Sequence, residues 1–197
     1  STPIKSSAAS DVYKRQDNAK VVTGMYSVNG IIYQFDSNGK LVLVKQGWHE
    51  SNGEKYYGMP DGTYRVGWLS FGNTYYYCGE DGAIVYGKQK IDGKWYYFDK
   101  NGVRQTGWIE KEGEKYYGMP DGSLRVGWLS FGSTRYYCNS DAVLVTDGPY
   151  TVDGMGYQFD KAGILVSAKG GWHEIGDKKY YGMPNGTYRV GWLSFGS

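Results

Sequence analysis

Aromatic and apolar residues recur along this chain in short runs with a period of about 20 residues. Runs of about five residues, such as "GWLSF" (67–71) and "KWYYF" (94–98), are separated by polar stretches that contain Gly, Asn or Asp. Aromatic and β-branched side chains favour strands, and runs of this length leave no room for a helix. Each period therefore predicts two short strands joined by a turn, which is a β-hairpin.

A glycine opens each period, and places within a repeat are counted from that glycine. Place 10 is Tyr in every complete repeat, and place 11 is Tyr in six of them. We expect the invariable Tyr at place 10 to be a core residue, because an array of hairpins with few aliphatic residues must pack on its aromatic rings. Eight complete repeats, numbered 1 to 8, and a cut-off ninth open at Gly24, Gly47, Gly67, Gly87, Gly107, Gly127, Gly148, Gly171 and Gly191.

Two turn signals recur within the repeats. The first lies near place 7, as in Asn29-Gly30, and supplies the positive φ angles of a two-residue hairpin turn. The second lies at places 15 and 16, as in Asp61-Gly62, where the preceding Pro60 presets φ for the turn. A repeat is therefore predicted to run as strand, turn, strand and closing turn.

A slower cycle of three repeats runs through the array. Place 12 is Phe in repeats 1, 4 and 7 (Phe-type), Gly in repeats 2, 5 and 8 (Gly-type) and Cys in repeats 3 and 6 (Cys-type). Three hairpins per turn of a solenoid would produce this cycle, because residues one turn apart share an environment. Triplication of a segment of about 60 residues would leave the same record. We predict an all-β fold, a β-solenoid of stacked ~20-residue β-hairpin repeats with about three per turn, over residues 24–197.

The first 23 residues do not follow the repeat. "DVYKRQ" (11–16) resembles the translated end of a transposon used in sequencing libraries. We therefore expect residues 1–16 to be a non-native or unstructured leader and residues 17–23 to be a lead-in. The chain has no initiating Met and stops within the pattern at "GWLSFGS", which favours an internal fragment.

Composition and the scarcity of histidine narrow the function classes. A formal net charge of +2 is too small for the clustered basic face of a nucleic-acid-binding protein, and no apolar run is long enough to cross a bilayer. His49 and His173 follow Trp in "GWHE", but Ile109 takes the equivalent place, so we expect a half-exposed strand position instead of a metal or general-base site. Acidic residues fall mostly in turns, and no nucleophile has a recognisable catalytic context. We predict no enzyme activity, no cofactor and no metal site.

The two cysteines, Cys78 and Cys138, both occupy place 12. They are either two small buried side chains with the same kind of neighbours or a disulfide between successive turns. The sequence leaves both interpretations open, because it does not show the short Cβ separation that a bridge requires.

One stretch carries a family resemblance. "GKQKIDGKWYYFDKNGVRQTGW" (87–108) resembles the cell-wall-binding repeat family, which comprises the choline-binding repeats of Gram-positive surface proteins and their relatives in glucan-binding proteins and clostridial toxin tails. The resemblance extends over residues 24–197. It implies an extracellular, cell-wall-associated protein that binds cell-wall polysaccharide, teichoic acid or glucan, with choline as one candidate ligand.

The resemblance also implies site residues. In choline-binding members, the ligand is caged by the Trp after the opening Gly, the aromatic residue at place 9 and an aromatic residue of the next repeat. Place 9 is a cation in four repeats (Lys55, Lys115, Arg135 and Lys179), which would repel choline and suit anionic phosphate or a neutral sugar, or mark a lost site. The candidate ligand-binding residues are Trp48, Trp68, Tyr75, Trp95, Trp108, Trp128, Trp172 and Trp192.

Two functions fit these observations. The first is a non-catalytic binding module that anchors a larger surface protein to bacterial cell-wall glycopolymer through aromatic sites at hairpin junctions, with the catalytic or adhesive domain outside this fragment. The alternative is a structural stalk or spacer with no ligand site. The stalk would bury all of its aromatic rings, so exposed aromatic cavities at the junctions would separate the two.

Overall fold

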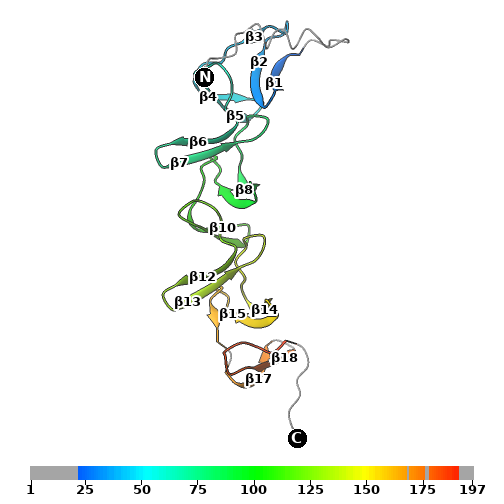
Figure 1. Ribbon diagram of the computed structural model, residues 1–197, viewed down its shortest axis with the longest axis vertical. Coiled ribbons are helices and arrows are strands. Elements are labelled where there is room, and N and C mark those ends of the chain that lie inside the picture. Colours follow the sequence, from blue (N-terminus) through cyan, green and yellow to red (C-terminus); the bar gives the residue numbers. More distant parts are fainter. Residues whose placement is uncertain (1–21, 168, 176–177, 191–197) are drawn as a thin grey trace. The chain divides into compact units, whose positions relative to one another are not determined.

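The computed structural model describes residues 22–167, 169–175 and 178–190. The leader expected over residues 1–16, most of the lead-in and Trp192 lie outside the described residues. Strands, turns and irregular segments make up everything within the described ranges, and none of these residues is helical. The all-β prediction is confirmed (Figure 1). In the same ranges, no helix could span a membrane.

Each of the eight complete repeats forms one antiparallel hairpin of two five-residue strands, at places 1–5 and 8–12. Repeats 1 and 7 are longer than the others, and each adds a two-residue third strand, β3 (Leu41–Val42) or β16 (Leu165–Val166). The hairpins are β1 (Gly24–Val28) with β2 (Ile31–Phe35), β4 (Gly47–Ser51) with β5 (Glu54–Gly58), β6 (Gly67–Phe71) with β7 (Thr74–Cys78), β8 (Gly87–Ile91) with β9 (Lys94–Phe98), β10 (Gly107–Lys111) with β11 (Glu114–Gly118), β12 (Gly127–Phe131) with β13 (Thr134–Cys138), β14 (Gly148–Val152) with β15 (Met155–Phe159), and β17 (Gly171–Ile175) with β18 (Lys178–Gly182).

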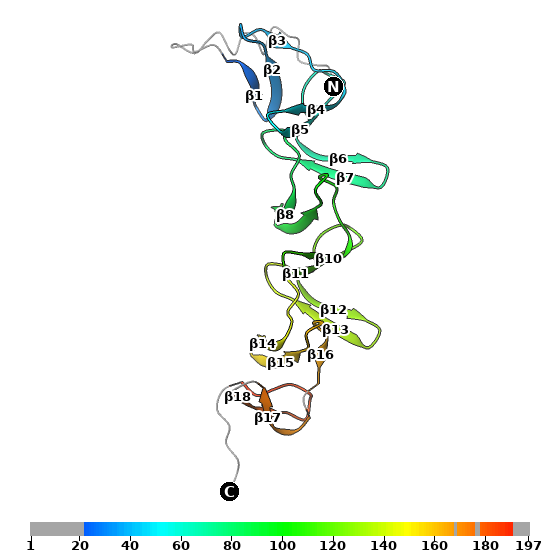
Figure 2. The same cartoon turned by 180° about the vertical axis from the view of Figure 1, so that it is seen from behind.

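The chain divides into two compact units. Unit 1 comprises Ser1–Gln89 and Phe98–Arg104, and unit 2 comprises Lys90–Tyr97 and Gln105–Ser197. Within unit 1, the β6–β7 hairpin lies across the view of Figure 2, whereas β1 and β2 stand steeply along it. Successive hairpins therefore point in different directions, so their aromatic faces meet at junctions instead of forming one continuous sheet.

The hairpin turns take the left-handed backbone that their sequences predict. Asn29 and Gly30 have φ angles of 52° and 76°, as in a type I′ turn with positive φ at both central residues. The Cys-type repeats differ, because their turns begin with glycine: Gly72 has φ of 59° and Gly132 has φ of 58°. A leading glycine is typical of a type II′ turn, which also matches the twist of the flanking strands.

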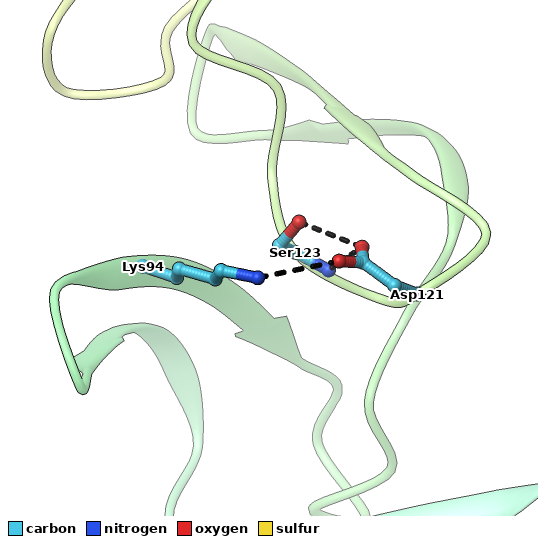
Figure 3. Close-up of polar contacts among 3 residues, drawn as sticks. All are labelled: Lys94, Asp121 and Ser123. Carbon is cyan, nitrogen blue, oxygen red and sulfur yellow. Dashed lines mark hydrogen bonds and ion pairs between the residues drawn. The ribbon is translucent and has the colours of Figure 1, made fainter.

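The closing turns are fixed by an Asp or Asn side chain, which stands at place 13 in some repeats and at place 15 in others. In repeat 5, Ser123 donates hydrogen bonds from its backbone N and its Oγ to Oδ1 of Asp121, at 2.9 and 2.7 Å (Figure 3). The Nζ of Lys94 lies 3.6 Å from Oδ2 of the same carboxylate. The hydrogen bonds from Ser123, aided by Lys94, hold the pKa of Asp121 below its ordinary value. The turn therefore keeps its carboxylate ionised.

Consecutive repeats are joined by a recurring backbone hydrogen bond. The carbonyl at place 9 of one repeat accepts from the N–H at place 18 of the next repeat, with N···O distances of 2.7–3.0 Å. The bond fixes the register between neighbouring hairpins and brings the side chains at these two places together. The donor and acceptor pairs are Tyr64 to Ile32, Ile84 to Lys55, Arg104 to Tyr75, Leu124 to Trp95, Leu144 to Lys115, and Tyr188 to Gly156.

The most deeply buried position is place 12, not place 10. Phe98, Phe159, Cys78 and Cys138 at place 12 are at most 1% exposed. At place 10 only the tyrosines Tyr56 and Tyr116 are buried, and the remaining ones are half-buried. The prediction that place 10 is uniformly core is therefore wrong. Place 12 ends the second strand against its own closing segment, whereas place 10 faces a junction between hairpins.

Both cysteines are free, buried thiols, so the structure favours the first of the two interpretations. Burial raises the pKa of the Cys78 thiol and of the Cys138 thiol to about 11. Each therefore stays protonated at neutral pH, and the thiolate that reacts with electrophiles is scarce.

We expect the native chain to resist labelling by a thiol reagent such as DTNB at pH 8. In denaturant, without added reductant, both cysteines should react at once, because unfolding exposes them and returns each pKa to its ordinary value. The absorbance of the released thionitrobenzoate measures both rates. Rapid labelling of the native chain would contradict the burial of the thiols. A lack of labelling in the unfolded chain would reveal a disulfide.

Candidate functional site

An exposed aromatic junction lies between repeats 2 and 3. Trp48 on β4 meets Tyr76 on β7 at a centroid distance of 5.0 Å and an angle of 65°. Tyr57, which is opposite Trp48 in the same hairpin, supports the indole from behind at 5.2 Å, and Phe71 lies at its edge at 6.1 Å. A near-perpendicular Trp–Tyr pair of this kind leaves ring faces available at the corner between the two repeats.

The same junction recurs between repeats 5 and 6, within unit 2. Trp108 meets Tyr136 at 5.1 Å and 65°, with Tyr117 at 5.1 Å and Phe131 at 6.1 Å. Trp48 and Trp108 are 45% and 49% exposed, and they line cavities of about 570 and 350 Å³. We call these two sites the open junctions.

A third, related cavity of about 560 Å³ surrounds Trp172, which is 60% exposed. Its own hairpin supplies Tyr181 at 5.4 Å, as Tyr57 does for Trp48.

The lysine at place 9 is balanced by a glutamate across the hairpin. Glu50 and Lys55 are cross-strand neighbours, with Oε1 and Nζ 4.0 Å apart, and both line the cavity of Trp48. The equivalent pairs are Glu110–Lys115 and Glu174–Lys179, each at 3.4 Å. These exposed pairs contribute little stability, but they remove the net positive charge that was expected to repel a cationic ligand.

His49 and His173 occupy half-buried strand positions. Nε2 of His49 lies 2.6 Å from the main-chain oxygen of Lys45, so that nitrogen carries the proton and donates to it. His173 makes the same contact with Lys169. The rings thus have a structural role, and no group of three metal-ligating side chains occurs among the described residues.

The junction between repeats 3 and 4 has a different occupant. The guanidinium carbon of Arg104 lies 4.1 Å from the ring centroid of Tyr75 and 5.9 Å from that of Trp68. All three side chains are half-buried. Trp68 and Tyr75 are the two positions that the family resemblance assigns to a cage, and the chain's own cation lies near both rings.

An arginine also covers the tryptophan at the junction between repeats 6 and 7. Arg135 at place 9 lies over Trp128, with its guanidinium carbon 4.3 Å from the ring centroid. Tyr157 of repeat 7 meets Trp128 at 4.9 Å and 75°. We call the junctions of Trp68 and Trp128 the arginine-capped junctions.

Trp95 belongs to the packing of its neighbours. It contacts the buried cluster that contains Tyr116 and Leu124, and its Nε1 donates a 3.0 Å hydrogen bond to the main-chain oxygen of Ser140. The Nζ of Lys90 lies 5.3 Å from the ring centroid. These contacts fix the indole within unit 2.

The structure thus sorts the candidate residues into different surroundings. Trp48, Trp108 and Trp172 are exposed at cavities; Trp68, Tyr75 and Trp128 lie under arginines; Trp95 is packed. Prediction from the sequence missed Tyr76 and Tyr136, which it treated as core. It also missed the glutamates at place 4, although Glu occurs there in each Gly-type repeat, opposite the lysine at place 9.

Comparison with known proteins agrees with this geometry. Residues 85–122 match a family model described as a choline-binding repeat, and residues 66–84 match one described as a cell wall binding repeat. A search of curated proteins found no match.

Solved structures share the fold. The chain is 27% identical to choline binding protein F of Streptococcus pneumoniae, solved in the presence of a peptidoglycan analogue, over 89% of this chain and 60% of that one, with a TM-score of 0.61. Another crystal form of that protein gives 29% identity over 75% of this chain and 49% of that one, with a TM-score of 0.55. CbpJ from Streptococcus pneumoniae TIGR4 is similar in fold, with 24% identity, coverage of 86% and 66%, and a TM-score of 0.58. The chain spans between about half and two thirds of the length of these structures. Residues 66–122 thus match models of cell-wall-binding and choline-binding repeats, and the hairpin fold of the chain is similar to that of choline-binding proteins.

Proposed function

We propose that this chain is a non-catalytic binding module that attaches a larger extracellular surface protein to choline-bearing cell-wall glycopolymer. The quaternary ammonium of choline would lie in the open junctions, against Trp48 and Tyr76 and against Trp108 and Tyr136. The observation that carries this proposal is an exposed Trp that meets a half-buried Tyr at a cavity, present once in each unit.

The physical chemistry of an open junction suits a soft cation. The faces of Trp and Tyr rings attract a quaternary ammonium electrostatically, and desolvation strengthens the contact. The carboxylate of Glu50 on the same wall adds attraction, while its pairing with Lys55 keeps that wall near neutral. Repetition of a weak site along a chain that meets a repetitive polymer raises the overall affinity by avidity.

We also propose that the hairpins wind as a β-solenoid with about three repeats per turn. Two observations support it. The hydrogen bond from place 18 to place 9 gives neighbouring repeats one recurring register. The junction types then follow the three-repeat cycle of the sequence, with an open junction after a Gly-type repeat and an arginine-capped junction after a Cys-type repeat.

The stalk interpretation is less well supported. A stalk whose aromatic rings are all core should have no exposed aromatic cavity at its junctions. Trp48 and Trp108 are exposed at such cavities. The structure of choline binding protein F with a peptidoglycan analogue supports a wall polymer as the partner class.

A sedimentation assay tests the proposed function. The folded chain should co-sediment with cell walls that carry choline-bearing teichoic acid, and free choline should release it. Walls stripped of teichoic acid and insoluble α-glucan serve as parallel surfaces. Retention on glucan alone would indicate that the ligand is a neutral sugar and not choline. Retention on none of these surfaces would favour the stalk.

A further inference from the structure

We propose that Arg104 and Arg135 are built-in occupants of the arginine-capped junctions, so that choline binds at the open junctions only. The inference rests on the proposed function and deepens it, because it names the residues that decide which junctions accept a ligand. Removal of either arginine should uncover a latent cation site.

The main chain holds Arg104 in place. Its backbone N–H donates a 2.8 Å hydrogen bond to the main-chain oxygen of Tyr75, so the two side chains are brought together by the register between repeats. The guanidinium then lies over the ring of Tyr75 and within cation–π distance of Trp68. These are the ring faces that a quaternary ammonium would need.

Arg135 reaches an equivalent position from another place in the sequence. It stands at place 9, where repeat 3 has Tyr75, and the residue at place 18 of the following repeat is Leu165 instead of an arginine. One arginine therefore comes from the following repeat and the other from within the same repeat, yet each covers the tryptophan at place 2. An arginine can therefore cover the tryptophan of a junction from more than one place in the repeat.

At the open junctions, no arginine of the described residues covers the tryptophan at place 2. Their lysines at place 9 pair with Glu50 and Glu110, and among the described residues no cation lies over Trp48 or Trp108. The exposure of the indoles agrees with this division of the junctions. Trp48 and Trp108 are exposed, whereas Trp68 and Trp128 are half-buried. A tethered cation competes at the high effective concentration of an intramolecular group, so a dilute external ligand would not displace it.

Counting choline sites tests the proposal. Binding of choline chloride to the folded chain is measured by isothermal titration calorimetry before and after Arg104→Gln. We expect one additional site per chain in the variant, and we expect adding Trp68→Ala to remove that site again. Lys100→Gln removes the same charge from an exposed turn of the same repeat and should leave the count unchanged.

Arg135→Tyr provides a second test. Arg135 is exposed, so its replacement should not disturb the fold, and the substitution gives place 9 an aromatic ring beside Trp128 and Tyr157. We again expect one additional choline site. An unchanged count in a folded variant, or a site on Trp68 already present in the parent chain, would overturn the inference.

The same titrations distinguish failure of the inference from failure of the proposed function. If the parent chain binds choline and neither arginine variant gains a site, only the inference fails. If the parent chain binds none and a variant gains one, the arginines do cover a cation site, but the open junctions do not bind choline and the proposed function fails. If no form of the chain binds choline, both fail.

Discussion

Replacing Gly58 with alanine should destabilise unit 1 severely. Gly58 stands at place 12, and a Cβ at this position would overlap the main-chain oxygen of Lys45 and lie 2.9 Å from Nε2 of His49. Neither neighbour can yield, because one is backbone and the other is held by its hydrogen bond to that same oxygen. Overpacking of this kind costs about 3 kcal/mol, so the urea midpoint followed by tryptophan fluorescence should fall sharply.

Gly170→Ala is the matched control. A Cβ at Gly170 meets nothing within 4 Å, and its backbone is outside the left-handed region, so alanine should be neutral or slightly stabilising. Gly118→Ala, where the Cβ would lie 2.7 Å from Cα of Thr106, should reproduce the loss in unit 2. Equal midpoints for Gly58→Ala and Gly170→Ala would show that the three-repeat cycle at place 12 has no steric cause.

Trp48→Ala and Trp108→Ala should each remove one choline site. A cation–π contact with a desolvated indole contributes about 2 kcal/mol, so the junction concerned should bind choline about thirtyfold more weakly. Both indoles are exposed, and the variants should keep the parent circular dichroism spectrum. Choline titration of the two single variants and the double variant measures the effect.

Conservative variants provide the control for this prediction. Trp48→Phe keeps an aromatic face and should retain weakened binding at its junction, because phenylalanine is a poorer cation–π partner than tryptophan. Trp68→Phe, at an arginine-capped junction, should leave choline binding unchanged. If the Trp68 variant loses as much binding as the Trp48 variant, the division of junctions into two kinds is wrong.

Local sequence signals were sufficient to predict the hairpins. Asn29-Gly30 and its counterparts need positive φ at both turn residues, and five-residue aromatic runs leave strand as the only regular element. The recurring Asp or Asn of the closing turns likewise satisfies nearby backbone N–H groups. These features depend on contacts within one repeat.

The capping of Trp68 could not be predicted in the same way, because it depends on a contact between repeats. The cage residues Trp68 and Tyr75 look available in the sequence, and only the register of the backbone reveals that Arg104 lies against them. Pairing of Glu50 with Lys55 was predictable in principle from the hairpin register, since two residues at places 4 and 9 face each other. Considering the lysine alone led to the expectation of repulsion.

The most direct test is a crystal structure of the chain with choline. Choline should lie against Trp48 and Tyr76 and against Trp108 and Tyr136, while Arg104 and Arg135 stay over their tryptophans. Choline over Trp68 or Trp128 with the arginine displaced, or an absence of choline from both open junctions at saturating concentration, would contradict the account.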